Sequence, residues 1–267
     1  MTSLGKMRRL HRILPRQSAL WLPVDDSLTV GPSGGLQDVG GLITQTKHEL
    51  DALLAFRGTL RSHADSLLST ALIENLTAST VERDHTRKSL VTSVERALSR
   101  GADAIAAHLN LTAASQSEIL QVIGNIADEA ENLGIPLVVI AYPRRQGDDG
   151  ADDNYESLKK QHFDQYVQLL CHTVRVAVEL GADVVKTKYT GDVESFGRVI
   201  EASMNVPVVA AGGVYVDAEE TITSAQSCLA AGARGLCFGR KVFSAPSPGP
   251  VVKTLRALTA SGSGKQP

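Results

Sequence analysis

Aromatic residues are scarce in this chain of 267 residues. Phe, Trp and Tyr together make up 4% of the sequence, although hydrophobic residues make up 43%. The core is therefore expected to consist of Val, Leu, Ile and Ala, as in proteins whose helices pack closely on a parallel sheet. Basic residues are not interleaved with aromatic ones, which argues against base stacking and makes nucleic acid an unexpected partner.

Cysteine is also rare, and no histidine pair has the spacing of metal ligands. Cys171, Cys228 and Cys237 are odd in number, lie far apart and form no CxxC motif. They argue for a reducing compartment and against a disulfide framework or structural zinc, and we interpret them as buried thiols. We expect neither a metal nor another cofactor.

The sequence lacks both a strong net charge and a long hydrophobic run. A net charge of −2 gives no basic field that would attract nucleic acid or an anionic membrane. No apolar run approaches the length of a membrane span, and no signal-peptide core follows the basic N-terminus, so we expect a cytoplasmic protein. Leu4, Met7, Leu10 and Leu14 recur at helical spacing, which favours a packed helix over the alternative of a transit peptide.

Short apolar runs alternate with amphipathic stretches from residue 19 to residue 259. We expect strands at 19–24, 52–56, 71–74, 104–109, 136–141, 182–185, 207–211 and 235–238. Between them we expect helices at 36–50, 90–99, 116–133, 155–180, 193–203 and 218–231, with a last helix at 250–258. The polar segments 76–89 and 146–154 are predicted to be mobile loops over one end of the sheet.

The pattern predicts an α/β protein with a single (β/α)8 TIM barrel, for which the chain length is typical. Residues 1–18 would form a helical N-terminal extension, residues 19–259 the barrel domain and residues 260–267 a disordered tail. The alternative is a doubly wound open sheet, which would require a glycine-rich fingerprint after the first strand. That fingerprint is not clearly present.

The segment GADVVKTKYTGD, residues 181–192, ends a predicted buried strand in lysine. Lys186 follows the apolar run, and Lys188 lies on the same face if the strand continues. The C-terminal ends of barrel strands hold the catalytic residues of TIM barrels. There, burial is expected to lower the pKa of Lys186 and free its amine to form a Schiff base with a carbonyl group. The alternative is that the ammonium group of Lys186 extends into solvent and has no catalytic role.

Other polar residues end the neighbouring predicted strands. Tyr142 ends the strand before the lysine strand, where it is suited to move protons or simply to cap the barrel. Asp25 ends the first strand and is suited to orient a substrate hydroxyl group, whereas the alternatives for Asp26 are to cap the N-terminus of a helix or to face solvent. His108 and Asn110 point to the same mouth by alternation, either as substrate contacts or as satisfied core residues.

Glycines follow the last two predicted strands. Gly212 and Gly213 come after strand seven, and Gly239 with Arg240 comes after strand eight. Barrels build phosphate sites from these two loops, because glycine lets backbone N–H groups approach the anion and a cation completes the charge. The two signals together predict a phosphorylated small-molecule substrate.

These motifs resemble a known family, the class I, Schiff-base aldolases of the DeoC/FbaB type. That family includes archaeal-type fructose-bisphosphate aldolase and 2-amino-3,7-dideoxy-D-threo-hept-6-ulosonate synthase, and the heptulosonate synthases are the more similar branch. The resemblance spans nearly the whole chain and is most specific at VVKTKYTGD, AYPR, VPVVAAGG and GARGLCFGRKVF.

The resemblance implies roles for individual residues. It places the Schiff-base lysine at Lys186, the proton-shuttling tyrosine at Tyr142 and the strand-one aspartate at Asp25. It also assigns phosphate binding to Gly212, Gly213, Gly239 and Arg240. We further expect Asp26, His108, Arg144 and Lys188 to contact the substrate, and the resemblance implies a homo-oligomer.

Two departures from the family pattern affect the predicted mouth. The family commonly has Asp-His-Gly after the first strand, where this chain has Asp25, Asp26 and Ser27. Its glycine pair usually precedes Pro-Lys, where this chain has Val214 and Tyr215. An added carboxylate at Asp26 would favour an amine-bearing or less anionic substrate.

The expected activity is that of a class I aldolase. Its donor would be a phosphorylated ketose or dihydroxyacetone phosphate, with aspartate semialdehyde as acceptor in a C7 amino-sugar or aminobenzoate-type pathway. The alternatives are a fructose-bisphosphate or other sugar-phosphate aldolase, a non-covalent isomerase and a catalytically silent phosphate-binding barrel.

Overall fold

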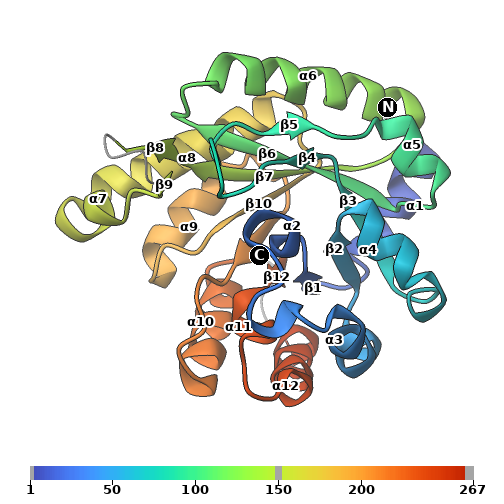
Figure 1. Ribbon diagram of the computed structural model, residues 1–267. Helices are drawn as coiled ribbons and strands as arrows, with labels where there is room; N and C mark the ends of the chain where they lie inside the picture. The colour runs from blue at the N-terminus through green and yellow to red at the C-terminus, as the bar shows by residue number, and fades with distance from the viewer. Residues whose placement is uncertain (1–2, 148–151, 262–267) are drawn as a thin grey trace.

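The core of the molecule is a closed barrel of parallel strands, seen in a computed structural model that describes residues 3–147 and 152–261 (Figure 1). Within these residues, eight strands follow one another around the barrel and β1 closes it by pairing with both β2 and β12. They are β1 (Ala19–Pro23), β2 (Ala52–Ala55), β3 (Ala71–Asn75), β6 (Ala104–Leu111), β7 (Leu137–Pro143), β10 (Val184–Lys188), β11 (Val208–Ala211) and β12 (Gly235–Cys237). The predicted (β/α)8 barrel is confirmed.

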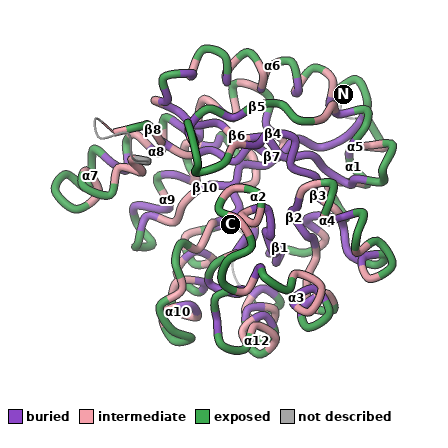
Figure 2. The backbone as a smooth tube through the Cα atoms, viewed as in Figure 1, coloured by how far each residue is buried: buried purple, intermediate pink, exposed green. Residues whose placement is uncertain are grey.

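Successive residues of each strand face opposite sides of the barrel wall and build two apolar layers. One layer fills the inside of the barrel and includes Trp21, Ile73, Ile140 and Val209, all buried. The other layer lies between the strands and the surrounding helices. Figure 2 shows the result as buried strands inside helices whose outer sides are exposed.

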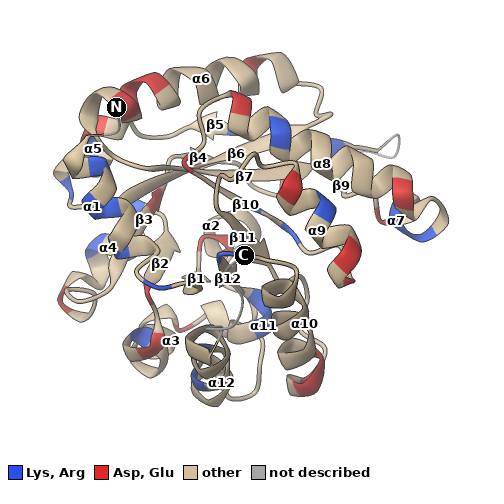
Figure 3. Ribbon diagram, turned by 180° about the vertical axis from the view of Figure 1, so that it is seen from behind, with Lys and Arg blue, Asp and Glu red and all other residues tan. Residues whose placement is uncertain are grey.

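Helices surround the barrel and carry many of the charged residues (Figure 3). They are α2 (Asp26–Val30), α3 (Val39–Thr46), α4 (Arg57–Ser62), α5 (Val94–Ser99), α6 (Gln116–Leu133), α7 (Glu156–Gln161), α8 (Phe163–Glu179), α9 (Val193–Glu201), α10 (Ala218–Ala230), α11 (Arg240–Phe243) and α12 (Pro248–Ser261). Helix α6 has the predicted bounds and ends at Gly134, whose left-handed backbone (φ +64°) closes it. None of the helices in the described residues is long and apolar enough to cross a membrane.

The predicted N-terminal helix is present as α1 (Leu4–Ile13) and covers the N-terminal end of the barrel. The indole N–H of Trp21, inside the barrel, donates a hydrogen bond of 2.7 Å to the carbonyl oxygen of Ile13. The buried ammonium group of Lys6 lies 2.5 Å from Glu131 and 3.0 Å from Asp183. These contacts fix α1 against the barrel floor.

Two short hairpins lie where the sequence predicted loops. Strands β4 (Thr77–Ala78) and β5 (Ser89–Leu90) pair antiparallel, and residues 76–91 are called the β4–β5 hairpin below. Strands β8 (Arg145–Gln146) and β9 (Asp152–Asp153) also pair antiparallel. Residues 148–151 of the second predicted loop lie outside the described residues.

Several predicted helix bounds were wrong. The helix expected from residue 90 begins at Val94, because Leu90 pairs with Thr77 and the side chain of Ser93 caps the helix. The helix expected over 155–180 is divided into α7 and α8 at His162, whose backbone is not helical (φ −140°, ψ 66°). Helix α12 extends to Ser261, so the expected tail is helical in its first two residues, and residues 262–267 lie outside the described part.

Candidate active site

Lys186 lies inside the C-terminal mouth of the barrel. Val184, two residues earlier on β10, belongs to the apolar layer inside the barrel, so alternation turns Lys186 to the same side. Thr187 faces the opposite side and donates a hydrogen bond of 2.8 Å to the carbonyl oxygen of Ala141. Only 6% of Lys186 is exposed.

The pKa of Lys186 is raised, not lowered as the sequence analysis expected. Burial opposes the ammonium form, as predicted, but the facing acidic groups Cys237, Tyr142, Asp25 and Asp26 outweigh it. The expectation was wrong because the sequence of one strand indicates that the lysine is buried. It does not indicate which acidic groups the other strands place beside it. Lys186 therefore rests as an ammonium group and must lose a proton before it can act as a nucleophile.

Cys237 and Tyr142 keep their protons at neutral pH. Burial raises the pKa of Cys237 to about 11, although the thiol shares a hydrogen bond with Lys186 that opposes the shift. Burial likewise raises the pKa of Tyr142 above its ordinary value. With Cys237 and Tyr142 protonated, Asp25 is the first of the two remaining acidic groups that favour the ammonium form of Lys186, and Asp26 is the second.

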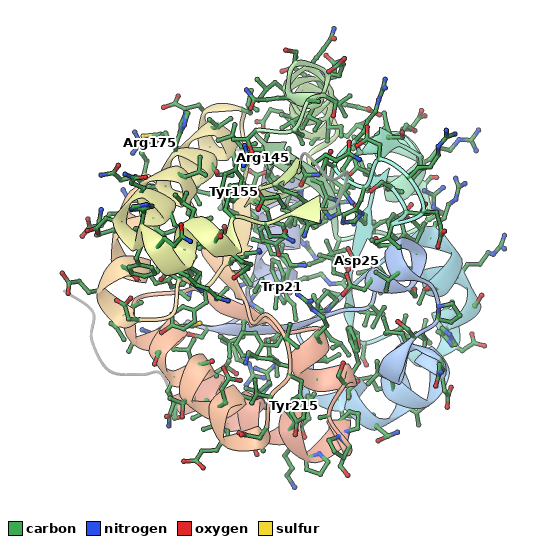
Figure 4. The ribbon with its side chains drawn as sticks, turned by 60° about the vertical axis from the view of Figure 1, so that its left-hand side comes forward. Trp21, Asp25, Arg145, Tyr155, Arg175 and Tyr215 are labelled. Carbon is green, nitrogen blue, oxygen red and sulfur yellow. The ribbon has the colours of Figure 1, made fainter. Side chains whose placement is uncertain are left out.

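Asp25 follows β1 and is buried, with 8% of its surface exposed. Burial raises its pKa, while Lys186 and a hydrogen bond of 2.8 Å from the side-chain amide of Asn75 favour the carboxylate. Asp26 is half-buried in the first turn of α2 and does not occupy the cap position. In Figure 4 Asp25 and Trp21 lie within the ring of elements, whereas Arg175 and Tyr215 lie toward its periphery.

Tyr142 lies on β7, the strand beside Lys186, with its ring against the apolar layer inside the barrel. The guanidinium carbon of Arg144 lies 5.8 Å from the centre of this ring, and Lys188 Nζ lies 5.9 Å from it. Two cations therefore lie above the phenol, whose hydroxyl group stays protonated at neutral pH. Such a group can donate a proton and then recover it.

His108 faces the same mouth from β6. Its Nδ1 lies 3.1 Å from Thr77 Oγ1, and its backbone N–H donates to the same hydroxyl oxygen at 2.9 Å. Burial, together with Lys88, Lys186 and Arg144, holds its pKa well below the ordinary value. His108 is therefore a neutral imidazole at physiological pH.

Arg144 and Lys188 lie at the outer part of the mouth. Arg144 contacts His85 Nε2 at 2.7 Å and donates to Asn154 Oδ1 at 2.8 Å. Lys188 pairs with Glu156 at 3.6 Å. Burial and the nearby Arg144 lower the pKa of Lys188 to about 8, although Glu156 opposes the shift.

The second hairpin borders this outer part of the mouth. Arg145 and Tyr155 are neighbours in Figure 4, and the guanidinium carbon lies 5.2 Å from the ring centre. Tyr155 donates a hydrogen bond of 2.8 Å to Thr112 Oγ1 beyond the end of β6. The hairpin is thereby fastened to the barrel rim.

Glycine is required in the loops after β11 and β12. A Cβ atom on Gly212 would lie 2.7 Å from Lys241 Cδ and from the ring of Phe238, and Gly213 has φ +78°. A Cβ atom on Gly239 would lie 3.0 Å from Pro23. Arg240 begins α11 as an exposed residue, close enough to the mouth to contribute to the lowered pKa of Lys188.

The structure brings Lys186, Tyr142, Asp25, Asp26 and His108 into one electrostatically connected group, with Arg144 and Lys188 above them. Sequence reasoning missed Asn75, Thr77, Cys237 and Lys88, which also face this group. Strand alternation was a usable signal for Asn75 and Cys237. No such signal existed for Lys88, because a loop brings it to the mouth.

Comparison with known proteins identifies the family of this chain. Residues 20–245 match the family model described as "DeoC/LacD family aldolase". The chain is 33% identical over 260 residues to a 2-amino-3,7-dideoxy-D-threo-hept-6-ulosonate synthase of Halobacterium salinarum, covering 97% of this chain and 92% of that protein. It is 34% identical over 258 residues to a 2-amino-4,5-dihydroxy-6-oxo-7-(phosphonooxy)heptanoate synthase of Streptomyces griseus, covering 95% and 88%.

Solved structures show the same fold. An archaeal fructose 1,6-bisphosphate aldolase has a TM-score of 0.82 at 24% identity, with 95% of this chain and 98% of that chain covered. A Schiff-base-forming fructose-1,6-bisphosphate aldolase has a TM-score of 0.80 at 25% identity, with 96% and 98% covered. The chain belongs to the DeoC/LacD family of aldolases and is an enzyme of the class I aldolase type.

Proposed function

We propose that this enzyme joins dihydroxyacetone phosphate, or a related phosphorylated ketose, to an aldehyde through a Schiff base on Lys186. The observation that carries the proposal is the environment of this amine. It is buried at the C-terminal end of a barrel strand, hydrogen-bonded to Cys237, and within electrostatic reach of Tyr142 and Asp25. A buried amine between a carboxylate and a protonated phenol has the partners that carbonyl condensation requires.

The reaction begins when Lys186 gives up its proton to Asp25, whose charge acts directly on the amine. The free amine attacks the ketone carbon, and the resulting carbinolamine loses water to form an iminium ion. Loss of a proton from the adjacent carbon gives an enamine, which attacks the aldehyde carbon and forms the new C–C bond. Tyr142 donates the proton that the new alkoxide takes up, and water then releases the product from Lys186.

The loops after β11 and β12 are proposed to hold the phosphate group. Gly212 and Gly213 keep side chains out of the way, so that backbone N–H groups can approach an anion, and Arg240 supplies a positive charge nearby. A phosphate group held in these loops positions the ketone for Lys186, because the binding energy of the phosphate is used to orient the reacting atoms.

The name of the Streptomyces griseus relative supports aspartate semialdehyde as the acceptor. Its seven-carbon product has a 2-amino acid at one end and a phosphate ester at the other. Three of these carbons correspond to dihydroxyacetone phosphate and four to aspartate semialdehyde, with the new bond between the two hydroxyl-bearing carbons. We propose the same pair of substrates here, in the biosynthesis of a C7 amino-sugar or aminobenzoate-type compound.

Borohydride trapping tests the covalent step. The protein is incubated with dihydroxyacetone phosphate, reduced, and analysed by intact mass and peptide mapping, in parallel with Lys186→Met and Lys188→Met. We expect a stable adduct on Lys186 that only Lys186→Met abolishes. Lys188, with its pKa of about 8, is the natural control, because it is the amine in the mouth that loses its proton more readily.

The possible results separate the candidate functions. An adduct on Lys188 would move the nucleophile to that residue. Turnover with fructose 1,6-bisphosphate and not with aspartate semialdehyde would favour a sugar-phosphate aldolase, the activity named for the similar solved structures. Absence of an adduct with a panel of phosphorylated ketoses would overturn the Schiff-base mechanism.

A further inference from the structure

Asn110 has a buried amide oxygen without a hydrogen-bond partner. None of its surface is exposed, and within the described residues no donor contacts Oδ1. Asn110 follows His108 by two positions on β6 and pairs in register with Tyr142, so its side chain turns to the same mouth. A buried acceptor that has lost water and gained no donor is destabilising unless a ligand supplies the donor.

The nitrogen of the same side-chain amide already forms a hydrogen bond. The side-chain nitrogen of Asn110 donates a hydrogen bond of 2.7 Å to the carbonyl oxygen of Thr86, on the β4–β5 hairpin. This bond identifies the nitrogen as the end that holds the hairpin and leaves the oxygen as the end available to a ligand. The bond therefore holds the β4–β5 hairpin against Asn110.

Two cationic residues belong to segments that contact β6 at Asn110 and at Leu111. Lys88 comes from the same hairpin, where its ammonium group donates to Ser79 Oγ at 2.7 Å. The backbone N–H of Arg144 bonds to the carbonyl oxygen of Leu111, the residue after Asn110. Both cations contribute to the lowered pKa of His108, which lies two residues before Asn110 on the same face of β6. A hydrogen-bond acceptor beside two cations matches a group that has an N–H donor next to a carboxylate, as an α-amino acid does.

We propose that Asn110 is a specificity-determining residue for the acceptor. Its Oδ1 accepts a hydrogen bond from the α-ammonium group of an amino-acid aldehyde, whose carboxylate lies toward Lys88 and Arg144. This assignment rests on the proposed function, since it concerns the second substrate of the same reaction. Asn110 Oδ1 would thus select for the amino group of the acceptor. Lys186 forms the Schiff base, and the loops after β11 and β12 bind the phosphate group.

The test compares two aldehydes that differ only in the amino group. Kinetics with aspartate semialdehyde and succinate semialdehyde are measured for the parent, Asn110→Ala and Asn110→Asp, with dihydroxyacetone phosphate as donor. Thr70→Val is the matched control, because Thr70 Oγ1 is also buried without a partner but lies before β3, at the other end of the barrel. Borohydride trapping of the donor on Lys186 checks that each variant is folded and active in the first step.

In Asn110→Ala we expect the preference for aspartate semialdehyde, as a ratio of kcat/KM values, to fall about tenfold or more, with donor trapping intact. Asn110→Asp keeps an acceptor oxygen and should retain the preference, although activity with both aldehydes should fall because the hydrogen bond to Thr86 is lost. Thr70→Val should leave the preference unchanged. An equal loss with both aldehydes in Asn110→Ala would reduce Asn110 to a support for the hairpin and overturn the assignment. If the parent forms no donor adduct, the proposed function itself fails and this assignment falls with it.

Discussion

Tyr142 is the residue to which we assign proton transfer, and its phenol can be removed without changing the size of the ring. In Tyr142→Phe we expect turnover to fall about 100-fold or more, because the alkoxide loses its proton donor. Borohydride trapping on Lys186 should persist, since that step precedes C–C bond formation. Steady-state turnover and intact-mass trapping measure the two effects separately, and retained turnover would refute the role.

Asp25 controls the charge of Lys186. In Asp25→Asn the carboxylate that favours the ammonium form is lost, so the pKa of Lys186 falls and more free amine is present at any given pH. Trapping rises with pH as the amine loses its proton, and its midpoint should therefore move to lower pH in the variant. The pH dependence of the trapping rate measures this midpoint.

Asp26→Asn is the matched control for this change. Asp26 also raises the pKa of Lys186, but its effect is smaller than that of Asp25 and its side chain is only half-buried. A smaller shift in the same direction is expected. A midpoint that stays in place in Asp25→Asn, or moves to higher pH, would show that other groups hold the charge of Lys186.

Helix α1 offers a test of how an element is attached to the barrel. Replacing Lys6 by Met removes the ammonium group that contacts Glu131 and Asp183. Hydrogen bonds to charged groups contribute about 2 kcal/mol, so the free energy of unfolding should fall by roughly that amount at pH 7. Arg8→Met is the control, since Arg8 is exposed on the same helix.

The fall in the free energy of unfolding caused by Lys6→Met should depend on pH in a defined direction. These partners raise the pKa of Lys6 in the folded protein, although burial opposes the shift. A raised folded pKa contributes stability that is complete below the unfolded pKa of about 10.4 and disappears as pH rises through the folded value. In urea unfolding from pH 7 to pH 11, the difference in stability between parent and variant should therefore begin to narrow at the alkaline end.

At the level of elements, the sequence predicted those whose apolar periodicity is strong and long. All eight barrel strands and α6 were predicted at or near their observed positions because their apolar patterns are continuous. Helices α2, α4 and α11 were not predicted, since helices of four to six residues show little periodicity. The β4–β5 hairpin was also missed, because each of its strands has two residues and its pairing depends on the barrel below.

The residues of the candidate site also fall into those that the sequence located and those that it missed. Residues at strand ends, such as Lys186, Tyr142 and Asp25, were located because alternation and strand order fix where they point. The raised pKa of Lys186 was not foreseen, because it depends on side chains from strands that are distant in sequence. Lys88 was missed for a related reason, since the fold of the hairpin brings it to the mouth.

For the molecule as a whole, ligand binding should appear as increased thermal stability. If the loops after β11 and β12 bind phosphate, inorganic phosphate at 100 times its Kd adds about 2.7 kcal/mol. For a chain of this size that raises Tm by about 5–10 °C. Differential scanning calorimetry with potassium chloride at equal ionic strength gives the baseline, and exposed Arg240, changed to Gln, should lose most of the increase. An equal rise in parent and Arg240→Gln would place the anion elsewhere.

The homo-oligomer expected from the family resemblance stays a prediction, which sedimentation velocity of the full chain measures directly. A species of a defined multiple of the 28.4 kDa chain is expected at micromolar concentration. A single species of 28.4 kDa would show that the chain acts as a monomer.

The closed N-terminal end of the barrel, which α1 covers, has a consequence for the order in which substrates bind. Ile13 and Leu14 pack against the apolar layer inside the barrel and close its N-terminal end, so in the described part of the chain Lys186 faces the end that the two hairpins border. Under the proposed function, a donor bound to Lys186 would lie deepest, with the acceptor above it and beneath the β4–β5 hairpin. An acceptor that arrived first would then block the donor, so we expect the substrates to bind in order and excess aldehyde to inhibit the enzyme in competition with the ketose.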